Sequence, residues 1–140
     1  MLKVVLDANL FVSGIITAQG NPAKILDLVR DDRLTLLISP ALLEEVRKVL
    51  LYPHIRKLHG FGSEQLDEKL GKLIAFARFT EGLLKIEAVK DDPTDDKYIE
   101  CAVEGGADYI ISGDRHLTDL KHYHGIKIVD PAFFLKIFKS

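Results

Sequence analysis

Short runs of β-branched residues and leucines recur along the chain and predict five strands. They lie at residues 3–7, 35–39, 83–87, 109–112 and 126–129. Several of these runs are apolar at nearly every position, which is typical of strands that are buried on both faces. Such strands belong to a parallel sheet with other elements covering both of its sides.

Helical patterns, with apolar residues three and four positions apart, alternate with these strands. The predicted helices cover residues 22–30, 40–50, 63–79, 93–104 and 131–138. Asn21, Ser39, Asp92 and Asp130 each precede a proline that opens one of these helices, so they are candidate caps. The alternation predicts an α/β fold, a three-layer sandwich around a central, mostly parallel five-stranded sheet.

Residues 52–62 fit neither pattern. Basic and aromatic side chains are mixed there with Pro53, Gly60 and Gly62. Such a segment can follow the backbone of a single-stranded nucleic acid and stack its bases. An exposed connection between two helices is the interpretation that we prefer of the two.

Length and composition favour one domain, residues 1–140, with a core that needs no disulfide, since the chain has 140 residues and a hydrophobic fraction of 47%. Its single cysteine, Cys101, cannot form an internal disulfide, which is consistent with a reducing compartment. Asp7 and Asn9 interrupt the apolar N-terminal stretch, and no apolar run of membrane-spanning length follows. We therefore expect a cytoplasmic protein with no membrane contact.

The formal net charge of −2 limits the ways in which this chain can bind nucleic acid. A protein that holds nucleic acid by a basic surface is normally distinctly positive. Either nucleic acid is not the ligand, or bound cations supply the missing positive charge. Composition leaves both possibilities open.

Four acidic residues fall at or just beyond the carboxyl ends of predicted strands, where sites form in open α/β sheets. Asp7 closes the first strand, and Asp114 follows the fourth. Glu45 lies in the helix that the second strand enters, and Asp96 lies in the first turn of the helix after the third. Distant segments of the chain thus deliver carboxylates to one edge of the sheet.

Helical spacing separates Glu45 from its neighbour Glu44. Glu45 shares a face with Ala41, Leu42 and Val49, which we expect to point into the core, whereas Glu44 is spaced to pair with basic residues at the surface. A carboxylate among apolar neighbours is costly unless a cation or hydrogen bonds compensate it. Glu45 is therefore the stronger candidate for a functional acid.

The same reasoning favours Asp96 over the acids beside it. Asp96 lies three residues before Ile99, in a stripe that continues to Val103 and is predicted to be buried. Asp92 and Asp95 have structural explanations instead, as a helix cap and as a favourable charge in a first helical turn.

Carboxylates that share a cleft repel each other unless they share protons or bind a cation. Oxygen ligands from aspartate and glutamate suit Mg²⁺ or Mn²⁺ rather than zinc. Such ions activate water and stabilise the charge that builds up on a phosphate. The four acids therefore predict a divalent metal site, while individual roles as caps or surface charges are the alternative.

Four short segments resemble the motifs of PIN domains. They are Asp7-Ala8-Asn9 with Ser13, residues 39–46 with the key acid on Glu45, residues 92–99 with the key acid on Asp96, and Ser112-Gly113-Asp114. No single motif is specific, but four in the correct order and spacing are. The chain looks closest to the VapC-related toxin components of toxin–antitoxin systems. Two positions differ from the usual motifs, since alanine follows Asp7 and serine stands at position 112, where threonine is common.

This resemblance implies a parallel sheet flanked by helices, a Mg²⁺ or Mn²⁺ cofactor, and hydrolysis of phosphodiester bonds, usually in RNA. It also implies a homodimer and a cognate antitoxin protein as partner. The apolar residues 133–135, with Ile137 and Phe138, can face such a partner, but packing on the sheet is the favoured interpretation.

The expected catalytic residues are Asp7, Glu45, Asp96 and Asp114. Asp7, Asp96 and Asp114 hold the metal ions in this hypothesis, and Glu45 binds metal or orients the attacking water.

Supporting and substrate-binding roles fall to five further residues. Asn9, Ser13 and Ser112 are expected to support the catalytic carboxylates by hydrogen bonds, with turn or capping roles as the alternative for Asn9 and Ser13. Lys97 and Arg115 each follow a site acid and are candidates for phosphate contacts, with solvated surface charges as the alternative.

Three rival functions fit parts of the same pattern. A phosphatase of the haloacid dehalogenase type also has an aspartate after its first strand, but its general acid would fall on Asn9, which cannot transfer that proton. A response-regulator receiver would have an acidic pair after its first strand, and this chain lacks that pair. An inactive PIN fold that only binds RNA is the non-enzymatic rival, and loss of one of the four acids would favour it.

Overall fold

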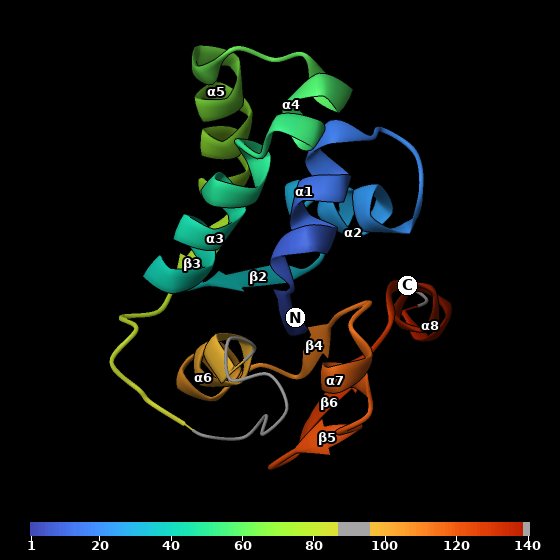
Figure 1. Cartoon of the computed structure of the whole chain (residues 1–140). Helices are drawn as coiled ribbons and strands as arrows, with labels where there is room; N and C mark the ends of the chain where they lie inside the picture. The colour runs from blue at the N-terminus through green and yellow to red at the C-terminus, as the bar shows by residue number, and fades with distance from the viewer. Residues whose placement is uncertain (87–95, 139–140) are drawn as a thin grey trace.

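The computed structural model describes residues 1–86 and 96–138. Six strands form one sheet within these residues, in the order β3-β2-β1-β4-β6-β5 (Figure 1). They are β1 (Lys3–Leu6), β2 (Thr35–Ile38), β3 (Ala77–Phe79), β4 (Tyr109–Ile111), β5 (His122–Tyr123) and β6 (Ile126–Val129). Neighbouring strands are parallel, except that β5 runs antiparallel to β6. The predicted α/β fold with a mostly parallel sheet is confirmed, but the prediction of five strands is wrong.

The third strand is not where the sequence pattern put it. Residues 81–86 have no regular structure, and residue 87 lies outside the described residues. The carboxylate of Glu104 accepts hydrogen bonds from the backbone N–H groups of Gly82, Leu83 and Leu84, and Glu100 accepts from that of Ile86. These side chains take the place of a neighbouring strand, so the apolar run needs no sheet partner.

Every predicted helix has a counterpart among the described helices, but the one predicted over residues 63–79 ends at Ile74, and residues 77–79 form β3 instead. The described helices are α1 (Ala8–Ile16), α2 (Asn21–Arg30), α3 (Pro40–Leu50), α4 (Pro53–His59), α5 (Ser63–Ile74), α6 (Asp96–Gly105), α7 (Arg115–Thr118) and α8 (Pro131–Ile137). Ser39 and Asp130 cap α3 and α8, accepting from the N–H groups of Leu42 and Phe133. Asn21 is not a cap, because the N-cap position of α2 is Gly20, at φ 103°. The predicted cap Asp92 and helix start at residue 93 lie outside the described residues.

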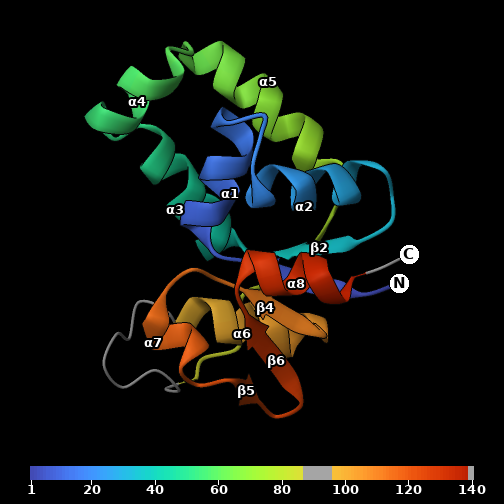
Figure 2. The same cartoon turned by 90° about the vertical axis from the view of Figure 1, so that its right-hand side faces the viewer.

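Two layers of helices cover the sheet (Figure 2). Helix α6 contacts β1, β2 and β4 on one face. Helix α1 contacts both α2 and α3 on the opposite side, and α8 joins them by packing against α2. The three layers agree with the sandwich predicted from the sequence.

The core lies between these layers, around β1, whose residues Val4, Val5 and Leu6 are almost completely buried. Helix α1 approaches α2 closely at Gly14, where an added Cβ would lie 2.6 Å from a methyl carbon of Leu26. Two positions predicted to face the core do not do so. Ala41 is exposed, and Val103 is 37% exposed, because each lies at the margin of the helix face that packs.

The apolar C-terminal residues divide between core and surface. Phe134 is fully buried, and its ring meets that of Tyr109 on β4 edge-on at a centroid distance of 5.4 Å. Phe133 and Ile137 remain about half exposed. The favoured interpretation, that this run packs on the sheet, thus holds for Phe134.

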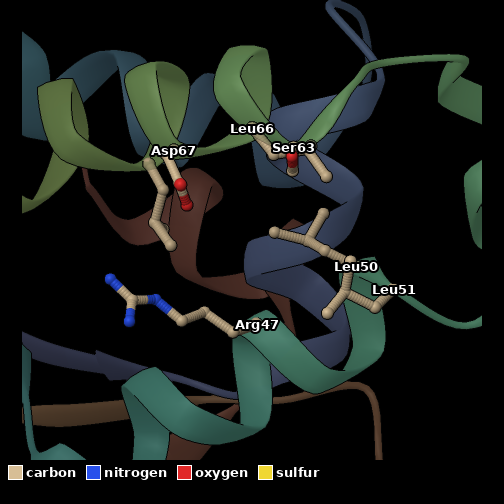
Figure 3. A pocket seen from close by; sticks show the side chains of 7 residues that line it. Arg47, Leu50, Leu51, Ser63, Leu66 and Asp67 are labelled. Carbon is tan, nitrogen blue, oxygen red and sulfur yellow. The ribbon is translucent and has the colours of Figure 1, made fainter.

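Within residues 52–62, Pro53–His59 form a short helix rather than an irregular loop. Helix α4 has no buried residue and ends at Gly60, at φ 65°. A small apolar pocket opens nearby between α3 and α5, with the side chain of Arg47 extending along one side (Figure 3). It is lined by Arg47, Leu50, Leu51, Ser63, Leu66, Asp67 and Leu70. The pocket lies at the C-terminal end of α3, away from the strand ends that carry the candidate acids.

Candidate active site

The candidate site begins where two central strands end together. Strands β1 and β4 are parallel neighbours, with Leu6 opposite Ile111. Asp7 follows β1, and Ser112 follows β4. The N–H of Asp7 donates to the carbonyl oxygen of Ile111 over 3.0 Å, so both chain segments leave the sheet side by side.

Asp7 is buried and held by hydrogen bonds on both carboxylate oxygens. It is the N-cap of α1, with Oδ1 accepting from the N–H of Leu10 over 3.0 Å. Its Oδ2 accepts from the hydroxyl of Ser112 over 2.5 Å and from the N–H of Gly113 over 3.3 Å. The N-terminus of α1 and these donors thus fix the orientation of a carboxylate that is only 4% exposed.

Ser112 connects Asp7 with Asp114. Its Oγ donates to Asp7 and accepts from the N–H of Asp114 over 2.9 Å. Asp114 caps α7 through a 2.8 Å hydrogen bond from the N–H of His116, and its side chain is 40% exposed. One fully buried hydroxyl thus fixes the spacing between two candidate acids.

Asp96 enters from the opposite side of the sheet, at the start of α6. It is 8% exposed. Two residues later, the Tyr98 hydroxyl accepts a hydrogen bond over 3.1 Å from the N–H of Ala8, which follows Asp7. The structure therefore brings the start of α6 against the start of α1.

Glu45 forms an ion pair with a residue that was predicted to bind substrate. Its Oε2 lies 3.7 Å from Nζ of Lys97, and both side chains are largely shielded from solvent. The same ammonium lies 5.3 Å from the ring centroid of Tyr98. Glu44, by contrast, is exposed, as its helical spacing predicts.

A polar cavity adjoins this ion pair between α3, α6 and residues 82–85. It is lined by Ser39, Pro40, Ala41, Glu44, Gly82, Leu84, Lys85, Lys97, Glu100, Cys101 and Glu104. Burial raises the pKa of the Cys101 thiol to about 11, so the side chain is a thiol rather than a nucleophilic thiolate at neutral pH. Glu104 accepts hydrogen bonds from the backbone N–H groups of residues 82–84, and these bonds hold the pKa of its carboxyl below the usual range.

The remaining predicted residues lie around this edge. Asn9 is exposed in the first turn of α1, Ser13 is half-buried one turn further, and Arg115 is exposed on α7. Among the described residues, the donors that hold the Asp7 carboxylate belong to Leu10, Ser112 and Gly113, and not to the Asn9 or Ser13 side chain.

Sequence reasoning did not single out Tyr98, Glu100 or Glu104. The two glutamates share one face of α6, four residues apart, which is a detectable signal. No sequence signal shows that Tyr98 bonds to the backbone of a residue 90 positions away.

The donor chemistry of the site suits Mg²⁺ or Mn²⁺. Asp7 and Asp96 are buried carboxylates, Asp114 is linked to Asp7 through Ser112, and the described partners of Asp7 are all uncharged. A negative charge so placed is compensated best by a cation with a preference for oxygen. Over residues 1–86 and 96–138, however, no three acidic, histidine or cysteine side chains already form a metal-binding group. The three-carboxylate centre therefore stays a prediction.

None of the helices in the described ranges is both long and apolar enough to cross a membrane.

Relatives of known sequence or structure agree with this architecture. An uncharacterized protein of Methanocaldococcus jannaschii, MJ1680, is 34% identical over 150 residues, covering 99% of this chain and 93% of that protein. The structure of VapBC2 from Rickettsia felis, bound to a DNA fragment from their promoter, has a TM-score of 0.57 at 15% identity, covering 91% of this chain and 97% of that one. PAE2754 from Pyrobaculum aerophilum has a TM-score of 0.57 at 14% identity, covering 96% and 88%.

A family model for the PIN domain matches residues 3–116, which include all four candidate acids. The resemblance drawn from the four motifs is thereby confirmed. The two solved structures support it at the level of the fold. The chain belongs to the PIN-domain family, a family of nucleases.

Proposed function

We propose that this PIN-domain protein is a divalent-metal-dependent endoribonuclease, with residues 1–140 acting as one nuclease domain. The observation that carries the proposal is the hydrogen-bonded group Asp7–Ser112–Asp114 at the carboxyl ends of β1 and β4. Asp7 and Asp114 each cap a helix, but capping alone does not explain why two carboxylates are joined through one buried hydroxyl at the same strand edge. Metal binding and phosphate chemistry explain their presence.

Asp7, Asp96 and Asp114 are the proposed ligands of Mg²⁺ or Mn²⁺. A bound ion would supply a more acidic water and neutralise charge on the phosphate that is attacked. The chain's own contribution is positioning. Ser112 and the α1 N-terminus hold Asp7, and the cap of α7 orients Asp114.

Glu45 and Lys97 are proposed to act together on the substrate side. Their ion pair keeps a carboxylate and an ammonium beside each other with limited solvent access. The Lys97 ammonium is suited to a phosphate oxygen of RNA, and the Glu45 carboxylate to the attacking water or a metal ion. Arg115 is a second candidate phosphate contact. Asn9 and Ser13 are proposed to support the site by hydrogen bonds in the substrate complex.

The direct test is cleavage of a panel of single-stranded RNAs with Mg²⁺, with Mn²⁺ and with a chelator. Wild type is expected to cleave at least one RNA only when metal is present. Asp7→Asn and Asp96→Asn should lose most of this activity, whereas Asp67→Asn, on the exposed side of α5, should retain it. Metal-independent cleavage, or equal activity of all variants, would contradict the proposal. RNA binding without cleavage would favour the inactive-module alternative instead.

An antitoxin partner is proposed on the likeness to VapBC2, and a homodimer on the family resemblance of the four motifs. That structure is of a toxin–antitoxin pair on promoter DNA, and it covers nearly all of this chain. Co-expression with a protein encoded next to this chain, followed by co-purification and light scattering, tests both points. A monomer that captures no neighbouring protein would contradict them. A cytoplasmic location is part of the same proposal.

A further inference from the structure

We propose that Tyr98 is a positioning residue that sets the separation of Asp7 and Asp96. This inference rests on the proposed nuclease function. Its hydroxyl joins the first turn of α6 to the start of α1, and so connects the two elements that carry these acids.

The Asp7 side of the site is fixed without any contribution from α6. Within the described residues, the donors to its carboxylate are Leu10 on α1 and the pair Ser112–Gly113 after β4. These bonds set the orientation of the carboxylate relative to the sheet. They place no constraint on Asp96, which comes from a helix on the other face.

Tyr98 supplies that constraint through the backbone. Ala8 is the first residue of α1, and its N–H belongs to the group of N–H donors that have no partner within a helix. Ala8 is 2% exposed, so water does not replace a missing partner there. The phenolic oxygen of Tyr98, itself 5% exposed, accepts this N–H. The bond therefore lies one residue after Asp7 and two residues after Asp96.

A second contact of the Tyr98 ring extends this effect to the substrate side. The Lys97 ammonium lies over the ring while it pairs with Glu45. Packing of the Tyr98 ring therefore also affects the position of Glu45, a third acid of the site. Removal of the hydroxyl leaves this ring contact in place and removes the bond to Ala8.

The test is Mn²⁺ binding measured by titration calorimetry, without substrate. Tyr98→Phe is expected to bind Mn²⁺ about tenfold more weakly than wild type, the size of effect seen when groups that orient metal ligands are removed. Tyr109→Phe is the chemical control, since its hydroxyl has no hydrogen bond within the described residues. Ile25→Val is the stability control, because it trims a fully buried core side chain in α2. Both controls should bind Mn²⁺ as wild type does.

Equal Mn²⁺ affinity of wild type and Tyr98→Phe would overturn the proposal while leaving the metal site intact. Equal weakening in Tyr98→Phe and Ile25→Val would also overturn it, because the effect would then reflect lost stability. If wild type itself binds no Mn²⁺, the metal site of the proposed function fails, and the role of Tyr98 fails with it. These outcomes separate the two proposals.

Discussion

Replacement of Asp96 by asparagine removes a negative charge from a buried position and keeps the shape of the side chain. Asp96 suits this test better than Asp7, which also caps α1 and would lose that role in part. If Asp96 contributes to a metal site, the metal-free Asp96→Asn protein should be as stable as wild type or more stable, because the mutual repulsion of the site carboxylates is reduced. The metal-bound protein should be less stable than metal-bound wild type.

The size of the effect follows from mass action. A cation present at 100 times its dissociation constant, and bound only by the folded state, adds about 2.7 kcal/mol to the free energy of unfolding. For a chain of 140 residues this corresponds to a rise in melting temperature of roughly 10 °C. A tenfold loss of affinity on Asp96→Asn reduces the added free energy to about 1.4 kcal/mol. The metal-induced rise should therefore fall by about half.

The assay is a thermal melt of both proteins, with and without millimolar Mn²⁺. If Asp96 is only a capping charge, Mn²⁺ has no effect, and the variant is slightly less stable in all conditions. A wild-type melting temperature that does not change with Mn²⁺ would refute the reasoning. An equal rise in both proteins would remove Asp96 from the site.

Four further predictions test individual contacts. Glu45→Gln should slow RNA cleavage far more than Glu44→Gln in the same assay, because Glu45 pairs with Lys97 near the site and Glu44 is exposed; equal rates would contradict the assignment. Ser112→Ala should cost about 1–3 kcal/mol of unfolding free energy in urea melts, since it removes the hydroxyl donor to the buried Asp7 carboxylate and the acceptor of the Asp114 N–H, and Ser112→Thr should restore most of it. Gly14→Ala should cost about 1–3 kcal/mol by its clash with Leu26, while Gly71→Ala, with open space around it, should not destabilise the protein. Because the pKa of Glu104 is lowered in the folded state, the charged Glu104 carboxylate should stabilise the fold fully above pH 4.5, its usual pKa, and progressively less as the pH falls towards the folded pKa. The melting temperatures of wild type and Glu104→Gln should therefore converge in acid.

Local signals predicted the parts of the fold that depend on local chemistry. Proline after Ser39 and after Asp130 marks the starts of α3 and α8 correctly, because capping is decided within one helical turn. The central strands β1, β2 and β4 are also correct, since each combines strong β propensity with burial of all but its first residue. The placement of acids at strand ends follows from these two predictions together.

Long-range contacts account for the errors. Strand β3 has only three residues and lies at the sheet edge with two of them exposed, so it lacks the apolar pattern of a buried strand. Strand β5 has two residues, too few for any periodicity. The apolar residues 83–86 resembled a strand but are held by side chains of α6, about twenty positions away in the chain for Glu104. The role of Tyr98 depends likewise on a backbone group that no sequence pattern reveals.

The attachment of residues 82–86 to α6 has a consequence for how this segment can vary among relatives. Glu104 and Glu100 bind only backbone N–H groups in this segment. The bonds therefore do not depend on which side chains stand at positions 83, 84 and 86. Many residue types are therefore compatible with the same path of the chain. Proline is the exception, because it has no N–H to donate. Where the glutamate corresponding to Glu104 is retained, proline should be absent from positions 82, 83 and 84, and where it is lost, that restriction should disappear.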